Sequence, residues 1–264
     1  MNQLTATDPL TTQRRIILAL LLLLAAASWS LLIWPRATPH AAHMASRGPT
    51  MGLAAPLFSA FWVVMMVAMM FPTAAPMVLA FHAVQAGKRA RGETFVATWI
   101  FVGAYVLVQA GSGIVAYLAA VSAEMGARSA GLTGLQTARM GGWLLIIAGL
   151  YQISPWKDAC LTKCRTPMSF IINSWHDGLG GALRMGVEHG LYCLGCCWLL
   201  CVILFPLGIM NVAAMAAITL LIFAEKSFPW GERVARISSA VLVAYGVAVL
   251  FVPRILPTFV AGPG

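Results

Sequence analysis

The sequence predicts an all-α fold, a polytopic bundle of helices that crosses a membrane. Of its 264 residues, 60% are hydrophobic and only 9% are charged, whereas soluble domains carry about 25% charged residues. Too few charges remain to cover a surface that faces water. Several apolar runs also approach or exceed the ~20 residues that a helix needs to cross a bilayer. We therefore expect one membrane domain over residues 16–252, between an N-terminal cytoplasmic segment, residues 1–15, and a short tail, residues 253–264.

About seven apolar runs are candidate membrane spans. Their approximate bounds are residues 16–34, 57–82, 94–121, 140–153, 186–205, 209–226 and 234–252. The first run follows Arg14 and Arg15 but ends in Trp-Pro-Arg, without a small-residue cleavage site, so we expect a retained span rather than a signal peptide. Segment 168–181 is too polar to span, which indicates an interfacial or re-entrant piece.

The positions of Lys and Arg predict the orientation. With the N-terminus inside, 12 of these residues are cytoplasmic, Lys157 and Lys226 among them, and 5 lie outside. This bias follows the positive-inside rule, and Glu225 and Lys226 are expected to be solvated at the interface. The net charge of +9 therefore implies no nucleic acid. We expect a multi-pass protein of the bacterial cytoplasmic membrane, with the lipid bilayer as its surroundings.

Four of the six cysteines lie in one apolar run. His189, Cys193, Cys197 and Cys201 follow one another at a spacing of four, so in a helix they share one face, and Cys196 flanks it. Thiolate and imidazole are ligands that Cu(I) and Zn(II) prefer. Cysteine is also a small hydrophobe common in buried helices, so packing is the alternative, above all for Cys201.

Further soft donors lie in other segments. The second run holds four methionines before Pro72, whose missing N–H frees a carbonyl and makes room beside the thioethers. Methionine is also a flexible core filler. Cys160 and Cys164 are expected at the cytoplasmic mouth, and a Pro-rich outer loop adds His40, His43 and Met44. The candidate ligands beyond the Cys193 run are Met65, Met69, Met70, Cys160, Cys164, Met210 and Met215.

Two polar residues are candidates for orienting the ligands. Glu188 precedes His189 and is placed to orient its imidazole. Glu188 also stands four residues after Arg184, which favours an ordinary surface ion pair. Asn211, at the start of the sixth run, either hydrogen-bonds across helices or lies beside the metal.

Three chemistries compete for these donors. A Cys-x-x-Cys pair is typical of a redox dithiol, but dithiols need no methionine partners. A structural zinc site needs four ligands, which Cys160, Cys164, His189 and Cys193 could supply. Cu(I) accepts a few Cys and Met donors, and the methionines favour it. Copper as Cu(I) is therefore the first expectation and zinc the runner-up.

Four sequence motifs resemble those of a known family, and this resemblance supports metal binding. The matching motifs are Ala68-Met-Met-Phe-Pro72, Tyr151-Gln…Pro155-Trp…Cys160-Leu-Thr-Lys-Cys164, Gly186-Val-Glu-His-Gly190…Cys193-Leu-Gly-Cys-Cys-Trp198 and Gly208-Ile-Met-Asn211. Together they resemble a bacterial family of poorly characterised integral membrane proteins described as predicted metal-binding. A methionine often stands near the position of Cys201 in that family, which leaves the role of Cys201 open. The positions that the resemblance implies as ligands or neighbours are Met69, Met70, Cys160, Cys164, Cys193, Cys196, Cys197, Met210 and Asn211.

The first functional hypothesis is Cu(I) transport, or delivery to a partner copper protein. Expected partners are a copper chaperone, a copper enzyme or another membrane subunit. The second hypothesis is a membrane oxidoreductase with a buried metal or dithiol, and the third is a zinc-stapled subunit of a larger complex. The sequence has no Ser-His-Asp arrangement, phosphate-cradling glycine loop or paired carboxylates, so hydrolysis and nucleotide chemistry have no support.

Overall fold

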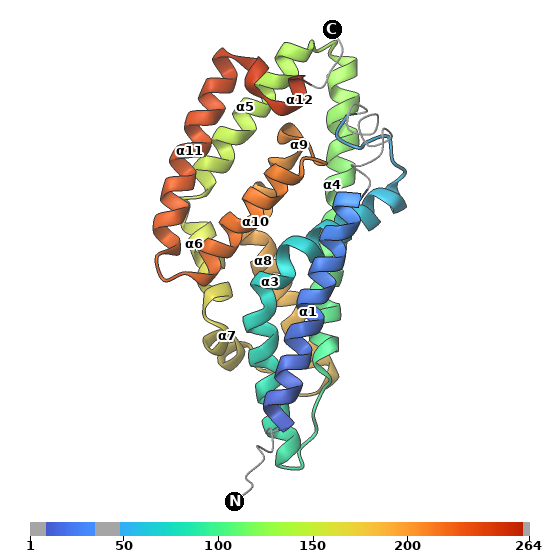
Figure 1. The fold of residues 1–264 in the computed structure, drawn as a ribbon, viewed down its shortest axis with the longest axis vertical. Coiled ribbons are helices and arrows are strands. Elements are labelled where there is room, and N and C mark those ends of the chain that lie inside the picture. The colour runs from blue at the N-terminus through green and yellow to red at the C-terminus, as the bar shows by residue number, and fades with distance from the viewer. Residues whose placement is uncertain (1–8, 35–47, 261–264) are drawn as a thin grey trace, which may run out of the picture.

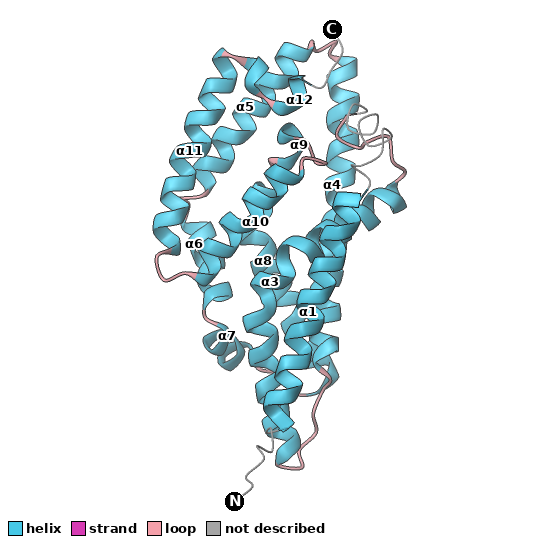
Figure 2. Ribbon diagram, in the orientation of Figure 1, coloured by secondary structure: helices cyan, strands magenta, loops and turns pink. Residues whose placement is uncertain are grey.

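The computed structural model describes residues 9–34 and 48–260, and this part of the chain is helical without strands (Figure 2). The all-α prediction is confirmed. His40, His43 and Met44 lie outside the described residues. The helices are α1 (Pro9–Ile33), α3 (Ala55–Ala90), α4 (Thr98–Ser129), α5 (Gly134–Tyr151), α6 (Pro155–Arg165), α7 (Pro167–Ser174), α8 (Gly178–Val202), α9 (Leu204–Leu207), α10 (Val212–Ser227), α11 (Gly231–Phe251), η2 (Pro253–Ile255) and α12 (Pro257–Val260).

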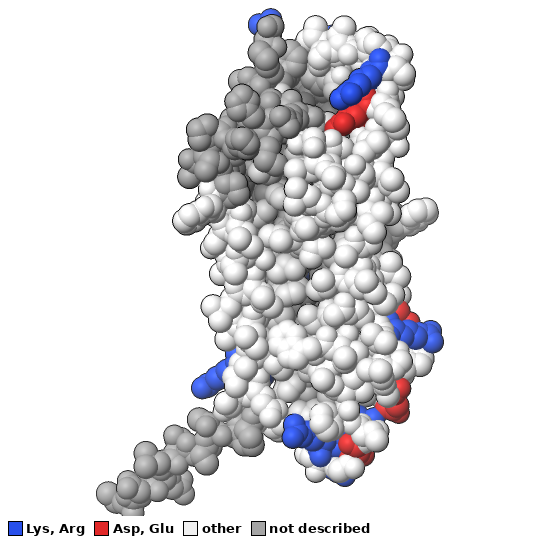
Figure 3. Space-filling view, turned by 90° about the vertical axis from the view of Figure 1, so that its right-hand side faces the viewer, with Lys and Arg blue, Asp and Glu red and all other residues white. Residues whose placement is uncertain are grey.

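The helices form an elongated bundle made of two packed groups. In one group, α1 packs on α3 and α4 packs on α3 and α8; in the other, α5 and α11 lie side by side (Figure 1). The short helices α6 and α10 lie between these groups. On the face drawn in Figure 3, charged side chains gather towards the two ends of the long axis, with a broad uncharged zone between them. This distribution is what a bilayer around the middle of the molecule requires.

Five segments of the described chain, not seven, are long and apolar enough to cross a membrane. They are Leu10–Ile33, Ala55–Ala90, Thr98–Ser129, Gly178–Leu207 and Gly231–Phe251.

The predicted fourth and sixth spans are wrong as spans. The fourth is α5, which has 18 residues but begins with a polar turn that contains Gln136 and Arg139. The sixth is α10, whose 16 residues extend about 24 Å at 1.5 Å per residue, less than the ~30 Å hydrocarbon core. Each helix packs one face on the bundle and leaves apolar side chains such as Trp143 and Leu220 exposed on the other.

Pro72 leaves a carbonyl of α3 free to bind α1. Pro72 has no N–H for the carbonyl of Ala68, four residues earlier. The indole Nε1 of Trp29, from α1, donates to that oxygen at 3.1 Å. The carbonyl freed by the proline, which the sequence suggested for a site, therefore joins two helices.

Glycines let α8 approach its neighbours closely. A Cβ on Gly186 would lie 2.5 Å from the carbonyl oxygen of Phe101, and one on Gly190 would lie 2.9 Å from Val108, both in α4. A Cβ on Gly195 would lie 2.8 Å from the sulfur of Cys160 in α6. Only glycine allows these approaches, which bring α4 and α6 against α8 at the level of its cysteines.

Candidate metal centre

The cysteines of α8 are buried in the bundle. Cys193, Cys196, Cys197 and Cys201 are at most 3% exposed, and the described residues contain no disulfide. A single regular helix carries all four, so the spacing of four does place Cys193, Cys197 and Cys201 on one face. This face points into the core rather than to lipid.

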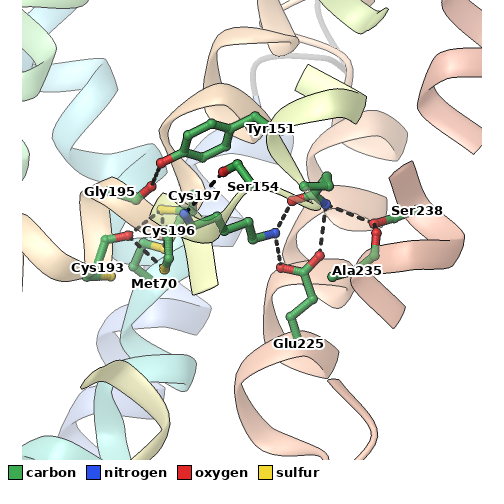
Figure 4. Close-up of polar contacts among 12 residues, drawn as sticks. Met70, Tyr151, Ser154, Cys193, Gly195, Cys196, Cys197, Glu225, Ala235 and Ser238 are labelled. Carbon is green, nitrogen blue, oxygen red and sulfur yellow. Dashed lines mark hydrogen bonds and ion pairs between the residues drawn. The ribbon is translucent and has the colours of Figure 1, made fainter. Parts of the chain in front are cut away.

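Met70 of α3 meets this thiol face. The Sγ atom of Cys197 donates to the Sδ atom of Met70 at 3.9 Å (Figure 4). The side chain of Cys193 lies close enough to that of Cys197 to interact with it. The Sγ atoms of Cys196 and Cys197 also donate to the backbone carbonyl of Cys193, at 3.1 and 2.9 Å. Two helices that are distant in the sequence thus bring thiols and a thioether together.

Helix α6 adds the remaining two cysteines at the same level. Cys160 packs on Gly195, between Cys193 and Cys197, and Cys164 is within hydrogen-bond reach of Cys193 and Cys196. The prediction that places them at a cytoplasmic mouth is therefore wrong, because α6 folds back along the middle of α8. We call Cys164, Cys193, Cys196 and Cys197 the thiol cluster.

Two residues beside Cys193 were not expected there. The hydroxyl of Tyr105 lies 3.2 Å from the Sγ atom of Cys193, and the Nζ atom of Lys226 donates to the same sulfur at 3.1 Å. Lys226 is partly exposed, so the prediction of a solvated Lys226 is only partly correct: its ammonium contacts a buried sulfur. The last turn of α10 brings this ammonium against α8, while Ser227 and Phe228, which follow Lys226, are exposed.

A buried polar network fixes α6 and α10 near the cluster. The Nζ atom of Lys157 lies 2.6 Å from the Oε2 atom of Glu225 and also donates to Gln152. The Nε2 atom of Gln152 donates to Glu225 and to Ser238, each at 2.8 Å (Figure 4). Lys157 is 0% and Glu225 2% exposed, so the expectation of a solvated Glu225 is wrong, and Lys157 is buried as well. No sequence signal marks this pair, since its members are 68 residues apart.

His189 lies one turn before Cys193 in a box of aromatic rings. Its ring centroid is 5.9 Å from that of Phe101, 5.6 Å from that of Tyr105 and 5.7 Å from that of Phe170. The imidazole is buried, and neither of its nitrogens has a hydrogen-bond partner in the described part of the chain. A buried polar group without a partner is costly, which makes His189 a candidate ligand.

The two polar residues predicted to orient ligands have other contacts. The carboxylate of Glu188 accepts from Arg184 at 2.9 Å, the ordinary helix pair that the spacing favoured. Asn211 caps α10: its Oδ1 accepts from the backbone N–H of Ala214 at 3.2 Å, and its Nδ2 donates to the carbonyl of Leu207. Capping is a sufficient structural role for an asparagine at that position.

The other predicted methionines are not brought to the cluster by any hydrogen bond that the described residues make. Met65 and Met69 are fully buried in α3, Met215 is buried in α10, and Met210 is partly buried before α10. Their roles stay predictions.

The donor set fits a soft monovalent metal. Thiols and a thioether are what Cu(I) prefers. Among the described residues, however, no three His, Cys, Asp or Glu side chains already form a finished metal site. The reason is visible at Cys196 and Cys197, whose thiols turn to the carbonyl of Cys193. Ligation would require a rotation about χ1 that exchanges a weak thiol hydrogen bond for a metal bond.

Comparison with known proteins gives one match. The model of the family described as "PpoB2: Copper chaperone" matches residues 59–249, which include the thiol cluster, Met70 and Lys226. No curated protein and no solved structure matches the chain.

Proposed function

Because the chain belongs to the PpoB2 copper chaperone family, we propose that it binds Cu(I) within its helical bundle and hands the ion to a copper-receiving partner. The observation that carries this proposal is the contact of Cys197 with Met70, since it joins a thiol to a thioether inside a cluster of thiols. Zinc and redox dithiols have no need of the thioether.

The proposed ligands are the Cys193 and Cys197 thiolates and the Met70 thioether. They are neighbours in the structure and supply the two or three soft donors that Cu(I) accepts. Cys164 lies within reach of Cys193 but belongs to another helix. Cys164 is therefore suited to the release of Cu(I), in which the ion exchanges one of its thiolate ligands for the Cys164 thiolate. Cys160, Cys196 and His189 are further donors on the same path.

The partner receives Cu(I) at or in the membrane. We place the protein in the bacterial cytoplasmic membrane, on the support of its five long apolar helices. A copper enzyme or another membrane subunit is the expected recipient, because a buried site cannot empty into water without exposing Cu(I). Ligand exchange with a docked protein avoids that exposure.

The test measures bound metal. The protein is purified in detergent under reducing conditions, supplied with Cu(I), and analysed by mass spectrometry beside a Cys193→Ser, Cys197→Ser double variant. We expect near-stoichiometric copper in the wild type and its loss in the double variant. Cys201→Ala is the matched control, a buried cysteine of the same helix outside the proposed ligand set.

Three other results would contradict the proposal. Copper retained by the double variant would remove Cys193 and Cys197 from the site. Zinc retained by it, but lost when Cys160 and Cys164 are changed, would support the zinc-stapled subunit. No metal after supply of Cu(I) would leave the cysteines as packing or as a dithiol.

A further inference from the structure

Lys226 is a lysine without a carboxylate partner. Among the described residues, Lys88 pairs with Asp177 and Glu93, and Lys157 pairs with Glu225. The acid next to Lys226 in the sequence is thus already neutralised by another lysine. The interaction that Lys226 does make is its 3.1 Å hydrogen bond to the sulfur of Cys193.

This ammonium lies at the edge of an apolar interior. Cys193 and Met70 are 0% exposed, and the hydroxyl of Tyr105 contacts Cys193 from the side of α4. In such surroundings charges interact more strongly than in water, and an unbalanced charge is costly. The net charge of the site therefore decides which ion it holds.

The charges balance for a monovalent ion. Cu(I) bound by two thiolates and a neutral thioether carries one net negative charge, which one ammonium cancels. Zn(II) with the same ligands is neutral, and the ammonium leaves an uncompensated positive charge beside it. We propose that Lys226 is a specificity-determining residue that favours Cu(I) over Zn(II) at the thiol cluster by matching its charge. This inference rests on the proposed function and adds a residue to it.

The experiment is a competition between the two ions. Wild type and Lys226→Met are equilibrated in detergent with Cu(I) and Zn(II) together, under reducing conditions, and the bound metals are counted by mass spectrometry. At the effective dielectric constant of a protein interior, a charge next to the site contributes substantially to the binding of an ion. We therefore expect the variant to lower the ratio of bound copper to bound zinc by about tenfold or more.

Two further variants separate charge from structure. Lys226→Arg keeps the positive charge, so its ratio should stay within about threefold of the wild type. Lys88→Met removes the same charge at the far end of α3 and should leave the ratio unchanged. If Lys226→Met does not purify as a folded protein, Lys226→Gln provides the same loss of charge with a polar side chain.

The outcomes are distinct. If Lys226→Met or Lys226→Gln keeps the wild-type ratio of bound copper to bound zinc, Lys226 does not determine specificity. The proposed copper function is unaffected by that result. If Lys226→Arg lowers the ratio of bound copper to bound zinc as much as Lys226→Met does, the assignment of Lys226 is also overturned, because the positive charge would not be the cause. A wild-type protein that binds no Cu(I) overturns the proposed function and this inference with it.

Discussion

Met70 is the residue through which α3 reaches the thiols of α8. Met70→Leu keeps the apolar volume of the side chain and removes the thioether, and such swaps usually cost less than about 1.5 kcal/mol of stability. We expect the affinity for Cu(I) to fall about tenfold, or ~1.4 kcal/mol, with little change in thermal unfolding. Titration against a coloured Cu(I) chelator measures this loss. Met66→Leu, a buried neighbour on the same helix, is the control, and equal affinities in both variants would exclude Met70 as a ligand.

At the level of single residues, the sequence predicted that the cysteines share a face but not which charged groups lie beside them. A spacing of four is preserved in any regular helix, so Cys193 and Cys197 were bound to share a face. Glu225 and Lys226 end an apolar run, where charges are normally solvated. The burial of Glu225 depends on Lys157 of α6, and the contact of the Lys226 ammonium with Cys193 depends on how α10 packs on α8. Only the tertiary structure shows these contacts.

Helix α6 is held against the bundle by the buried Lys157–Glu225 pair. Glu225→Gln leaves the Lys157 ammonium buried without a counterion, a loss that costs about 3–5 kcal/mol in other proteins. We expect a lower unfolding temperature and faster alkylation of Cys160 and Cys164, as α6 loosens from α8. Differential scanning fluorimetry and mass spectrometry of alkylated peptides measure the two effects.

The control for this helix contact is Glu188→Gln. Its pair with Arg184 lies at the surface of one helix, where such pairs contribute about 0.3–0.5 kcal/mol. We expect almost no change in either measurement. If Glu225→Gln is as mild as the control, the buried pair does not anchor α6.

The turn between α7 and α8 is tied to the end of α3 by Asp177. The Lys88 ammonium and the indole N–H of Trp175 both donate to its carboxylate, which holds the pKa of Asp177 below its usual value. A lowered pKa means that the contact contributes above the usual pKa, about 3.9, and is lost as the pH falls through the lowered value. We therefore expect faster backbone hydrogen exchange at residues 175–178 below about pH 4, after correction for intrinsic rates. Asp177→Asn should exchange fast at neutral pH already, whereas an unchanged rate there would show that the carboxylate does not hold the turn.

On the scale of the whole molecule, composition was enough to predict an all-α membrane bundle, and hydropathy was not enough to count its spans. α5 and α10 are apolar like spans, but α5 begins with a polar turn and α10 has only 16 residues. Burial against protein and burial in lipid favour the same residues, so sequence alone does not separate them. The predicted orientation, N-terminus inside and C-terminus outside, stays a prediction.

That orientation can be tested with α4, whose 32 residues extend about 48 Å at 1.5 Å per residue and connect the two ends of the bundle (Figure 1). A reporter enzyme that is active only outside the cytoplasm is inserted in the turn before α4, at Gly92, or in the turn after it, at Gly131. Both are exposed turns, where insertions are usually tolerated. Because Lys88, Arg89 and Arg91 precede Gly92, we expect activity at Gly131 and none at Gly92. The opposite result would place the N-terminus outside the cytoplasm and contradict the predicted orientation.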